Sequence, residues 1–164
     1  MSEGPPGGPD SRPGNPSPTH GDPDPAPAPE RAHGPDTHQL YTRGLDLLGR
    51  GSPAAAAQLL QRAAAAEPRS RSVREALARA QFDAGQYAAA AGNFRMIVDA
   101  SPSDDYAQFG LGLALARTGD PGAAAEHLAL AAAMRPNLRH YTDALRSVRA
   151  TLRARRDMPR GQGD

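Results

Sequence analysis

The chain has 164 residues, of which 38% are hydrophobic and 23% are charged, and its formal net charge at pH 7 is +1. This length suits one ordinary domain, and the balance of charges excludes a strong electrostatic bias of the whole molecule. The absence of cysteine excludes disulfides, thiolate zinc sites and thiol nucleophiles. Lysine is absent as well, whereas alanine, arginine, glycine and proline are abundant, which we interpret as the base composition of a GC-rich bacterial genome of actinobacterial type.

Residues 1–35 are rich in proline and glycine. They hold eleven of the seventeen prolines and six glycines, and no aliphatic side chain larger than that of alanine. Such a segment cannot bury enough apolar surface to offset the entropy of ordering, so we predict a disordered N-terminal tail. Proline alternates with Asp or Ala from Pro23 to Pro29, which favours polyproline II. This stretch is either a ligand for an aromatic groove or, as we favour, a solubilising tail.

The start of the chain carries no basic-then-apolar signal segment. No run approaches the ~18 consecutive apolar residues of a membrane-spanning helix. We therefore expect a cytoplasmic protein.

Proline recurs at equal intervals, at Pro68, Pro102 and Pro136, and other residues recur with it. Each copy turns at a glycine and continues with an alanine and a large apolar residue: Gly51, Ala56 and Leu60; Gly85, Ala90 and Phe94; Gly119, Ala124 and Leu128. A fixed period of this length indicates stacked copies of one structural unit. The sequence therefore predicts a repeat domain over 36–136, with units in register at 37–70, 71–104 and 105–138.

Helix signals alternate with breakers inside each unit. Ser52-Pro53 and Asp120-Pro121 are typical of an N-cap followed by a first-turn proline, and the recurring glycines can take the left-handed conformation that ends a helix. Apolar residues are spaced by three and four, and no stretch alternates with period two, so the expected fold is all-α. We predict helices at 37–50, 53–66, 71–84, 87–99, 104–117 and 121–134.

These repeats resemble the tetratricopeptide repeat (TPR) family over about residues 37–136. The resemblance rests on the small residues Gly44, Ala78 and Gly112, on the recurring alanines and prolines, and on the strict period. The slots that hold Trp and Tyr in the family pattern are degenerate: the first holds Leu40, Arg74 and Gln108, and the second holds Leu47, Gln81 and Leu115. The resemblance implies an α-solenoid of three helix-turn-helix repeats that binds other proteins.

By the same resemblance, the first helix of each unit lines a concave groove for a peptide or helix of a partner protein. The residues expected to line this groove are His38, Tyr41, Leu45, Leu48, Glu75, Arg79, Phe82, Tyr106, Phe109, Leu113 and Arg117. Exposed aromatic residues with arginine nearby are typical of binding hot spots. We expect Tyr41 and Tyr106 to be exposed, whereas Phe82 and Phe109 are either exposed or buried between adjacent units. Some family members clamp a C-terminal carboxylate with Lys and Asn, and the lack of lysine disfavours that mode here.

A capping helix is predicted at 137–157, followed by a flexible tail at 158–164. Asn137 can cap this helix, and an apolar stripe suited to cover the third unit follows: Leu138, Tyr141, Leu145, Val148 and Leu152. A basic stripe runs beside it: Arg146, Arg149, Arg153, Arg156 and Arg160. Residues 139–164 hold seven arginines and three acidic residues, a net charge of +4. The basic stripe is either a solvated face, which we favour, or a docking face for an acidic partner, a membrane surface or nucleic acid.

The sequence contains no nucleophile elbow, phosphate-binding glycine loop or metal motif. We therefore expect no enzymatic activity, no metal and no cofactor. The leading hypothesis is a cytoplasmic adaptor or scaffold that binds an unidentified protein in the groove. The alternative is a regulatory docking protein whose Arg-rich C-terminal helix binds an acidic partner or nucleic acid, with nucleic acid the less expected of the two. A short array with an apolar end can also self-associate.

Overall fold

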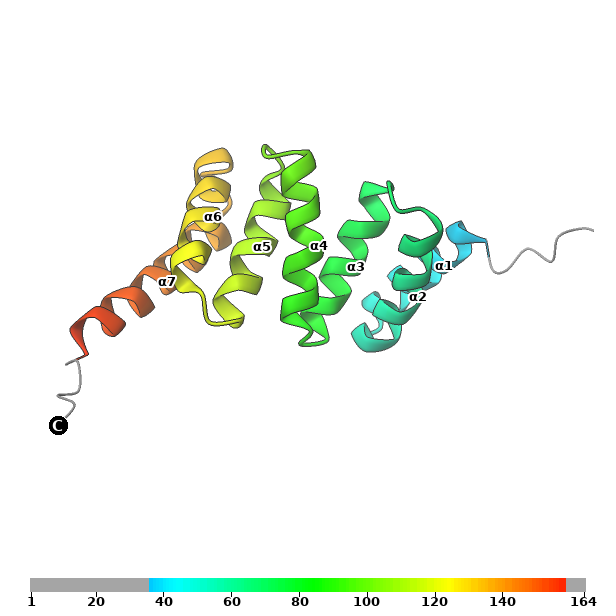
Figure 1. The fold of residues 1–164 in the computed structure, drawn as a ribbon, viewed down its shortest axis with the longest axis horizontal. Helices are drawn as coiled ribbons and strands as arrows, with labels where there is room; N and C mark the ends of the chain where they lie inside the picture. Colours follow the sequence, from blue (N-terminus) through cyan, green and yellow to red (C-terminus); the bar gives the residue numbers. More distant parts are fainter. Residues whose placement is uncertain (1–35, 159–164) are drawn as a thin grey trace, which may run out of the picture. The chain divides into compact units, whose positions relative to one another are not determined.

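The computed structural model describes residues 36–158, and all regular structure in this range is α-helical (Figure 1). The seven helices are α1 (Thr37–Gly49), α2 (Pro53–Ala66), α3 (Arg71–Asp83), α4 (Tyr87–Ala100), α5 (Asp105–Arg117), α6 (Pro121–Met134) and α7 (Arg139–Asp157). They form one compact unit in which each helix contacts the next along the chain. Within residues 36–158, no helix combines the length and the hydrophobicity that a membrane span requires.

The expected all-α solenoid is confirmed, and the six predicted helical ranges of the repeats agree with α1 to α6 to within one residue at each end. The tail predicted at 1–35 lies outside the described residues, as does 159–164. The sequence period is visible in the helix starts. Helices α1, α3, α5 and α7 begin at equal intervals, at Thr37, Arg71, Asp105 and Arg139, and α2, α4 and α6 follow with the same spacing. Helix α7 is therefore a fourth first helix in register with the others.

A glycine follows the end of the first helix in each of the three repeats. The φ angles of Gly51, Gly85 and Gly119 are 74°, 78° and 92°, so the predicted left-handed conformation is confirmed. The backbone N–H after each glycine reaches back to a carbonyl of the last helical turn, as in Ser52 N to Leu47 O at 2.9 Å. This is the Schellman arrangement, which satisfies carbonyls that the helix leaves open and turns the chain into the second helix.

Side-chain caps occur at some of the predicted helix starts. Asp120 accepts a hydrogen bond from the backbone N–H of Ala123 at 3.0 Å, as expected for an N-cap. Ser52 occupies the N-cap position of α2, but its side chain makes no capping hydrogen bond. The expectation that Asn137 caps the last helix is wrong, because α7 begins at Arg139 with Leu138 at the N-cap position.

The two helices of a unit approach closely at a small residue. A Cβ atom added to Gly44 would lie 2.6 Å from Cγ of Leu60, and one added to Gly112 would lie 2.6 Å from Cγ of Leu128. Ala78, at the same position of the second unit, is fully buried. Real Cβ atoms do not come this close to a neighbour, so Gly44 and Gly112 leave the space that the leucine side chains of the second helix fill.

Helix α7 covers the end of the third unit, as its apolar stripe predicted. Tyr141, Leu145 and Val148 are buried in the same core cluster as the α5 and α6 residues, and Leu138 and Leu152 pack against that cluster. The Tyr141 hydroxyl donates to Asp105 at the start of α5 at 3.0 Å. Burial, with a further contribution from this hydrogen bond, raises the pKa of Tyr141.

Polar residues in the degenerate family slots are satisfied by hydrogen bonds to the second helix of their own unit. In the second unit, Arg74 donates to Asn93 Oδ1 at 3.0 Å, and Asn93 Nδ2 donates to Gln81 Oε1 at 2.8 Å. In the third unit, Gln108 Oε1 lies 2.7 Å from His127 Nδ1. Asn93 and His127 are one repeat apart, so the same position of the second helix meets the polar slot in both units. Buried polar side chains are tolerated when they are paired in this way.

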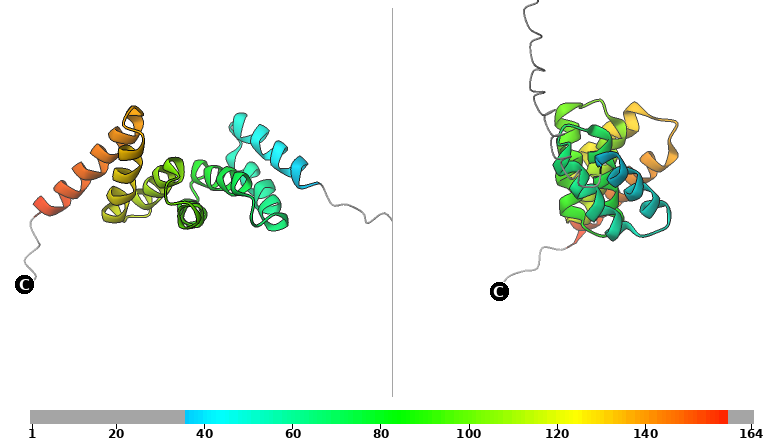
Figure 2. Two further views of the ribbon diagram at one scale, coloured as in Figure 1. Left: turned by 90° about the horizontal axis from the view of Figure 1, so that it is seen from above. Right: turned by 90° about the vertical axis from the view of Figure 1, so that its right-hand side faces the viewer.

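First helices contact one another from unit to unit, whereas second helices do not. Among the described helices, α1 contacts α3, α3 contacts α5 and α5 contacts α7, but α2, α4 and α6 make no such contacts with each other. The first helices are therefore closer together than the second helices, and they form one continuous face of the unit (Figure 2).

Ala124→Leu should lower the free energy of unfolding by about 1–3 kcal/mol, because Ala124 is fully buried and extra methyl groups would overpack the interior. Ala133→Leu is the matched control, since Ala133 lies on the same helix and is exposed. Chemical denaturation of the two variants and the parent measures the difference. Equal stability of both variants would contradict the helix register described here.

His127 should make stability depend on pH. Burial, with the positive charge of Arg95, lowers the pKa of His127 below its ordinary value of 6.5. The folded protein therefore binds this proton less readily than the unfolded chain, so stability is complete above about pH 6.5 and decreases as the pH falls below it. Denaturation at about pH 7.5 and about pH 5.5 should show a larger loss for the parent than for His127→Gln. A larger loss in the variant would contradict this assignment.

Candidate functional site

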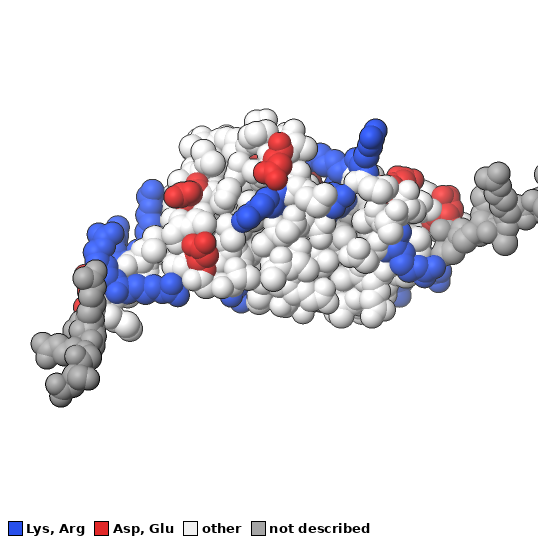
Figure 3. Space-filling model, viewed as in Figure 1, with Lys and Arg blue, Asp and Glu red and all other residues white. Residues whose placement is uncertain are grey.

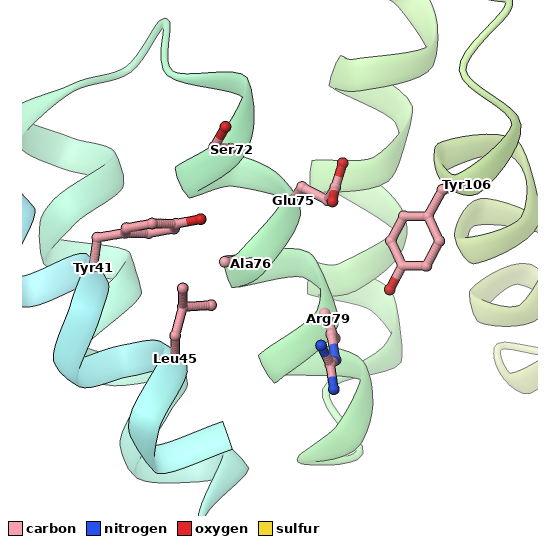
Figure 4. A pocket seen from close by; sticks show the side chains of 7 residues that line it. All are labelled: Tyr41, Leu45, Ser72, Glu75, Ala76, Arg79 and Tyr106. Carbon is pink, nitrogen blue, oxygen red and sulfur yellow. The ribbon is translucent and has the colours of Figure 1, made fainter. Parts of the chain in front are cut away.

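A hollow of about 320 Å³ lies on the face formed by the first helices (Figure 4). Tyr41 and Leu45 border it from α1, and Tyr106 borders it from α5. Helix α3 lies between them and contributes Ser72, Glu75, Ala76 and Arg79. Three successive first helices thus line one depression. They do so because α1 contacts α3 and α3 contacts α5.

A second hollow of about 190 Å³ adjoins the first. Its lining is mostly apolar and aromatic: Arg79, Phe82, Asp83, Phe94, Tyr106, Phe109, Gly110 and Leu113. Arg79 and Tyr106 line both hollows, so the two lie next to each other. We call the residues of these two hollows together the first-helix groove.

Three aromatic rings of the first-helix groove, those of Phe82, Tyr106 and Phe109, are half-buried. The ring of Phe109 stacks on that of Tyr141 with centroids 4.3 Å apart, and Tyr106 meets Phe94 edge to face at 6.1 Å. Phe82 meets Tyr87 in the same manner at 5.1 Å. Each ring is therefore held by a neighbour while part of it remains open to solvent. Both alternatives considered for Phe82 and Phe109 hold in part, because these rings pack against the core cluster and also line the groove.

Opposite charges meet at the edge of the first-helix groove. Arg71 forms a charge-assisted pair with Asp104, whose side chain is 6% exposed, and a second pair with Glu75 at 3.1 Å. The hydrogen bond to Asp104 is the main cause that raises the pKa of Arg71. Burial raises the pKa of Glu75, against the opposing effect of Arg71. Arg71 thus ties the start of α3 to the start of α5 and holds Glu75 at the rim.

Arg79 is the one arginine that lines the first-helix groove, and the protein holds it only weakly. Its only ion pair in the described part of the chain is with Asp83, at 3.9 Å, and its side chain is 57% exposed. By contrast, Arg117 lies over the rings of Phe82 and Tyr87, at 6.0 and 5.3 Å from their centroids. Arg79 is therefore the guanidinium that a bound molecule can reach most easily.

The structure brings most of the predicted groove residues together. Eight of the eleven line the two hollows: Tyr41, Leu45, Glu75, Arg79, Phe82, Tyr106, Phe109 and Leu113. His38 borders a smaller hollow of about 170 Å³ that Tyr41 also lines. Leu48 packs against the core cluster of the first unit, and Arg117 covers aromatic rings instead of lining either hollow.

Phe94 lines the second hollow but was not among the predicted groove residues. Its ring reaches the first-helix groove because Gly110 on α5 has no side chain, and a Cβ there would clash with the ring. The first and second units carry Thr42 and Ala76 at the corresponding position. The glycine at this position, where the other repeats carry a side chain, was the sequence signal that could have predicted the place of Phe94 in the groove.

The predicted basic stripe is only partly assembled into one surface. Arg146, Arg149 and Arg153 line a hollow of about 270 Å³ with Thr142 and Leu145. Arg156 is exposed in the last turn of α7, where a cation interacts favourably with the helix dipole. Arg160 lies outside the described residues.

Within residues 36–158, no cluster of three or more His, Asp or Glu side chains is arranged to hold a metal ion. Two of the three histidines there have structural neighbours: His127 lies next to Gln108, and the ring of His140 meets Phe109 edge to face at 5.3 Å. The first-helix groove itself offers aromatic surface and single charges of both signs, which suits binding of a partner.

A family model described as Tetratricopeptide repeat matches residues 41–105 and 76–139, which together exceed half of the chain. The chain belongs to the tetratricopeptide repeat family. The first and second helices of each TPR unit are the pairs α1–α2, α3–α4 and α5–α6, and α7 follows as the cap. The resemblance inferred from the small residues and the period is thereby confirmed.

Solved TPR structures share this fold at low sequence identity. The first TPR of Spaghetti (RPAP3) bound to the HSP90 peptide SRMEEVD is 20% identical with a TM-score of 0.66, covering 71% of this chain and 92% of that one. The Sgt2 TPR domain from Aspergillus fumigatus is 21% identical with a TM-score of 0.67, covering 80% and 89%. The first TPR domain of human RPAP3 is 20% identical with a TM-score of 0.67, covering 76% and 99%. No match was found among curated proteins.

Asp104→Ala should lower the free energy of unfolding by about 1–2 kcal/mol, because Asp104 caps α5 through Ala107 N at 3.0 Å and also pairs with Arg71. Asp46→Ala is the control, since Asp46 is exposed and forms only a surface ion pair with Arg50. Thermal denaturation compares the two. A loss for Asp104→Ala no larger than for the control would contradict the role of this contact.

Proposed function

We propose that this TPR protein is a non-enzymatic cytoplasmic adaptor that binds a peptide or helical segment of another protein in the first-helix groove. The observation that carries the proposal is that the two hollows adjoin each other at Arg79 and Tyr106, so that residues of α1, α3 and α5 line neighbouring parts of one face. A surface of this kind can hold several side chains of one ligand segment.

The chemistry of the groove indicates what the segment carries. Half-buried rings of Tyr106, Phe82 and Phe109 offer pre-positioned aromatic surface, which binds apolar side chains at little entropic cost. Leu45 adds an aliphatic residue that is 39% exposed. The ligand is therefore a segment with at least two apolar anchors.

The charges of the groove refine this description. Glu75 and Arg79 both face the first hollow, so its lining has no strong excess of either sign. The Spaghetti (RPAP3) domain cited above is bound to an HSP90 peptide that contains acidic residues. This chain contains no lysine, so we do not expect it to clamp the C-terminal carboxylate of such a peptide through Lys and Asn side chains. Apolar anchors, with a single acidic contact to Arg79, fit the groove better.

Selection of peptides from a random display library against the full chain should yield sequences with recurring apolar or aromatic residues. Tyr106→Ala and Leu45→Ala should each weaken binding of a selected peptide by about tenfold or more, because both side chains line the groove. Fluorescence anisotropy measures the affinities, and circular dichroism confirms that the variants remain folded.

Leu130→Ala is the matched control, because Leu130 lies on α6 and is 51% exposed away from the groove. Its affinity should equal that of the parent. If Leu130→Ala weakened binding as much as Leu45→Ala, or if neither groove variant had any effect, the groove would not be the binding surface.

A further inference from the structure

Helix α7 occupies the place of a first helix and packs against α6, but within the described residues no second helix follows it to complete a fourth unit. In each of the three repeats, a second helix covers the first, in the pairs α1–α2, α3–α4 and α5–α6. Since α7 begins one full repeat after α5, its residues correspond one to one with those of α5. The side of α7 on which a second helix would lie is consequently open.

The residues on that open side differ in kind from those of the repeats. Arg146 stands where the repeats have Gly44, Ala78 and Gly112. Arg149 stands where they have Leu47, Gln81 and Leu115. The hollow of about 270 Å³ lined by Arg146, Arg149, Arg153, Thr142 and Leu145 lies on this side. We call these five residues the α7 face.

The positive charge of the α7 face is poorly neutralised by the protein. Arg146 pairs with Asp143 at 2.7 Å, but both side chains are largely exposed, so this pair is easily exchanged. Arg149 and Arg153 make no ion pair or hydrogen bond within residues 36–158. The described end of the unit at α7 shows mainly basic side chains (Figure 3). Residues 36–138, with ten arginines and ten acidic residues, have no net charge, so the positive charge is local to this helix.

Arg146 is incompatible with a second helix packed on α7 as closely as α6 packs on α5. At Gly112, even a Cβ would lie 2.6 Å from Leu128 of the second helix, and Arg146 places a whole side chain at the equivalent point. Neither a helix from a partner nor the first unit of a second copy can approach α7 in the manner of a TPR second helix. An extended segment, which lies farther from the helix axis, meets no such obstacle.

The chemistry favours an acidic peptide over nucleic acid. Single-stranded nucleic acid is usually held by aromatic stacking along an extended basic groove, whereas no aromatic residue lines the α7 face. Arginine forms bidentate hydrogen bonds with carboxylates. Leu145 contributes a small apolar surface to the hollow that the arginines line.

We propose that the α7 face is a second binding site, separate from the first-helix groove, for a short, extended, acidic segment of a partner protein. The carboxylates of the segment pair with Arg149 and Arg153, and one apolar side chain lies over Leu145. This site is distinct from the groove because the two share no lining residue.

The test uses the full chain and a fluorescent heptapeptide that has acidic residues on both sides of a central leucine. Arg149→Glu with Arg153→Glu should weaken its binding by about tenfold or more. Raising NaCl from about 50 to about 300 mM should weaken binding to the parent as well, because exposed charge pairs are screened. A peptide with Gln and Asn in place of the acidic residues should bind the parent no better than the acidic peptide binds the double variant.

Arg43→Glu with Arg62→Glu is the matched control, because both arginines are exposed on the first repeat and the net charge changes by the same amount. Its affinity should stay close to that of the parent, and circular dichroism should show all forms folded. Equal losses in the two double variants, or no binding of the peptide to the parent, would overturn the proposal.

Tighter binding of an oligothymidine with the same dependence on Arg149 and Arg153 would assign the face to nucleic acid instead. If light scattering showed that the parent is a dimer and that the Arg149→Glu, Arg153→Glu variant is a monomer, the α7 face would be assigned to self-association.

Discussion

The structure depends on a close approach of two helices at a residue with little or no side chain. Gly44 lies against Leu60 and Gly112 against Leu128, so the second helix of each unit rests almost on the backbone of the first. Because this contact recurs with the sequence period, each unit packs against the following unit through equivalent residues. The first helices then contact each other, and the groove between them is the consequence. Close packing of this kind leaves little freedom for rearrangement.

The same constraint separates two surfaces of different chemistry. The first-helix groove combines half-buried aromatic rings with single charges of both signs, whereas the α7 face is basic. Where a fourth unit would require a small residue, the chain carries Arg146, so a further second helix cannot pack there. A solenoid needs a polar end to remain soluble. The arginines of α7 satisfy that need, and they also form the surface for which we propose an acidic segment as the ligand.

Much of the fold could be predicted because the period and the turn glycines are local signals. The prolines and glycines placed α1 to α6 to within one residue, and the apolar stripe identified α7 as a cap. Contacts between units could not be predicted, because they join residues far apart in the sequence, as in the pair of Arg71 and Asp104. The entry of Phe94 into the groove was also missed, since it depends on the space above Gly110. Asn137 was assigned as a cap by residue type alone, and the backbone places Leu138 there.

The most direct test of the close-approach constraint compares the free energies of unfolding of Gly112→Ala and Gly92→Ala. In both helices alanine is intrinsically favoured over glycine by about 1 kcal/mol. Nothing lies within 4 Å of a Cβ at Gly92, whereas a Cβ at Gly112 would meet Leu128 at 2.6 Å and the carbonyl oxygen of Ala124 at 3.1 Å. Gly92→Ala should therefore stabilise the protein and Gly112→Ala should destabilise it. Equal stabilisation by both substitutions would contradict the account.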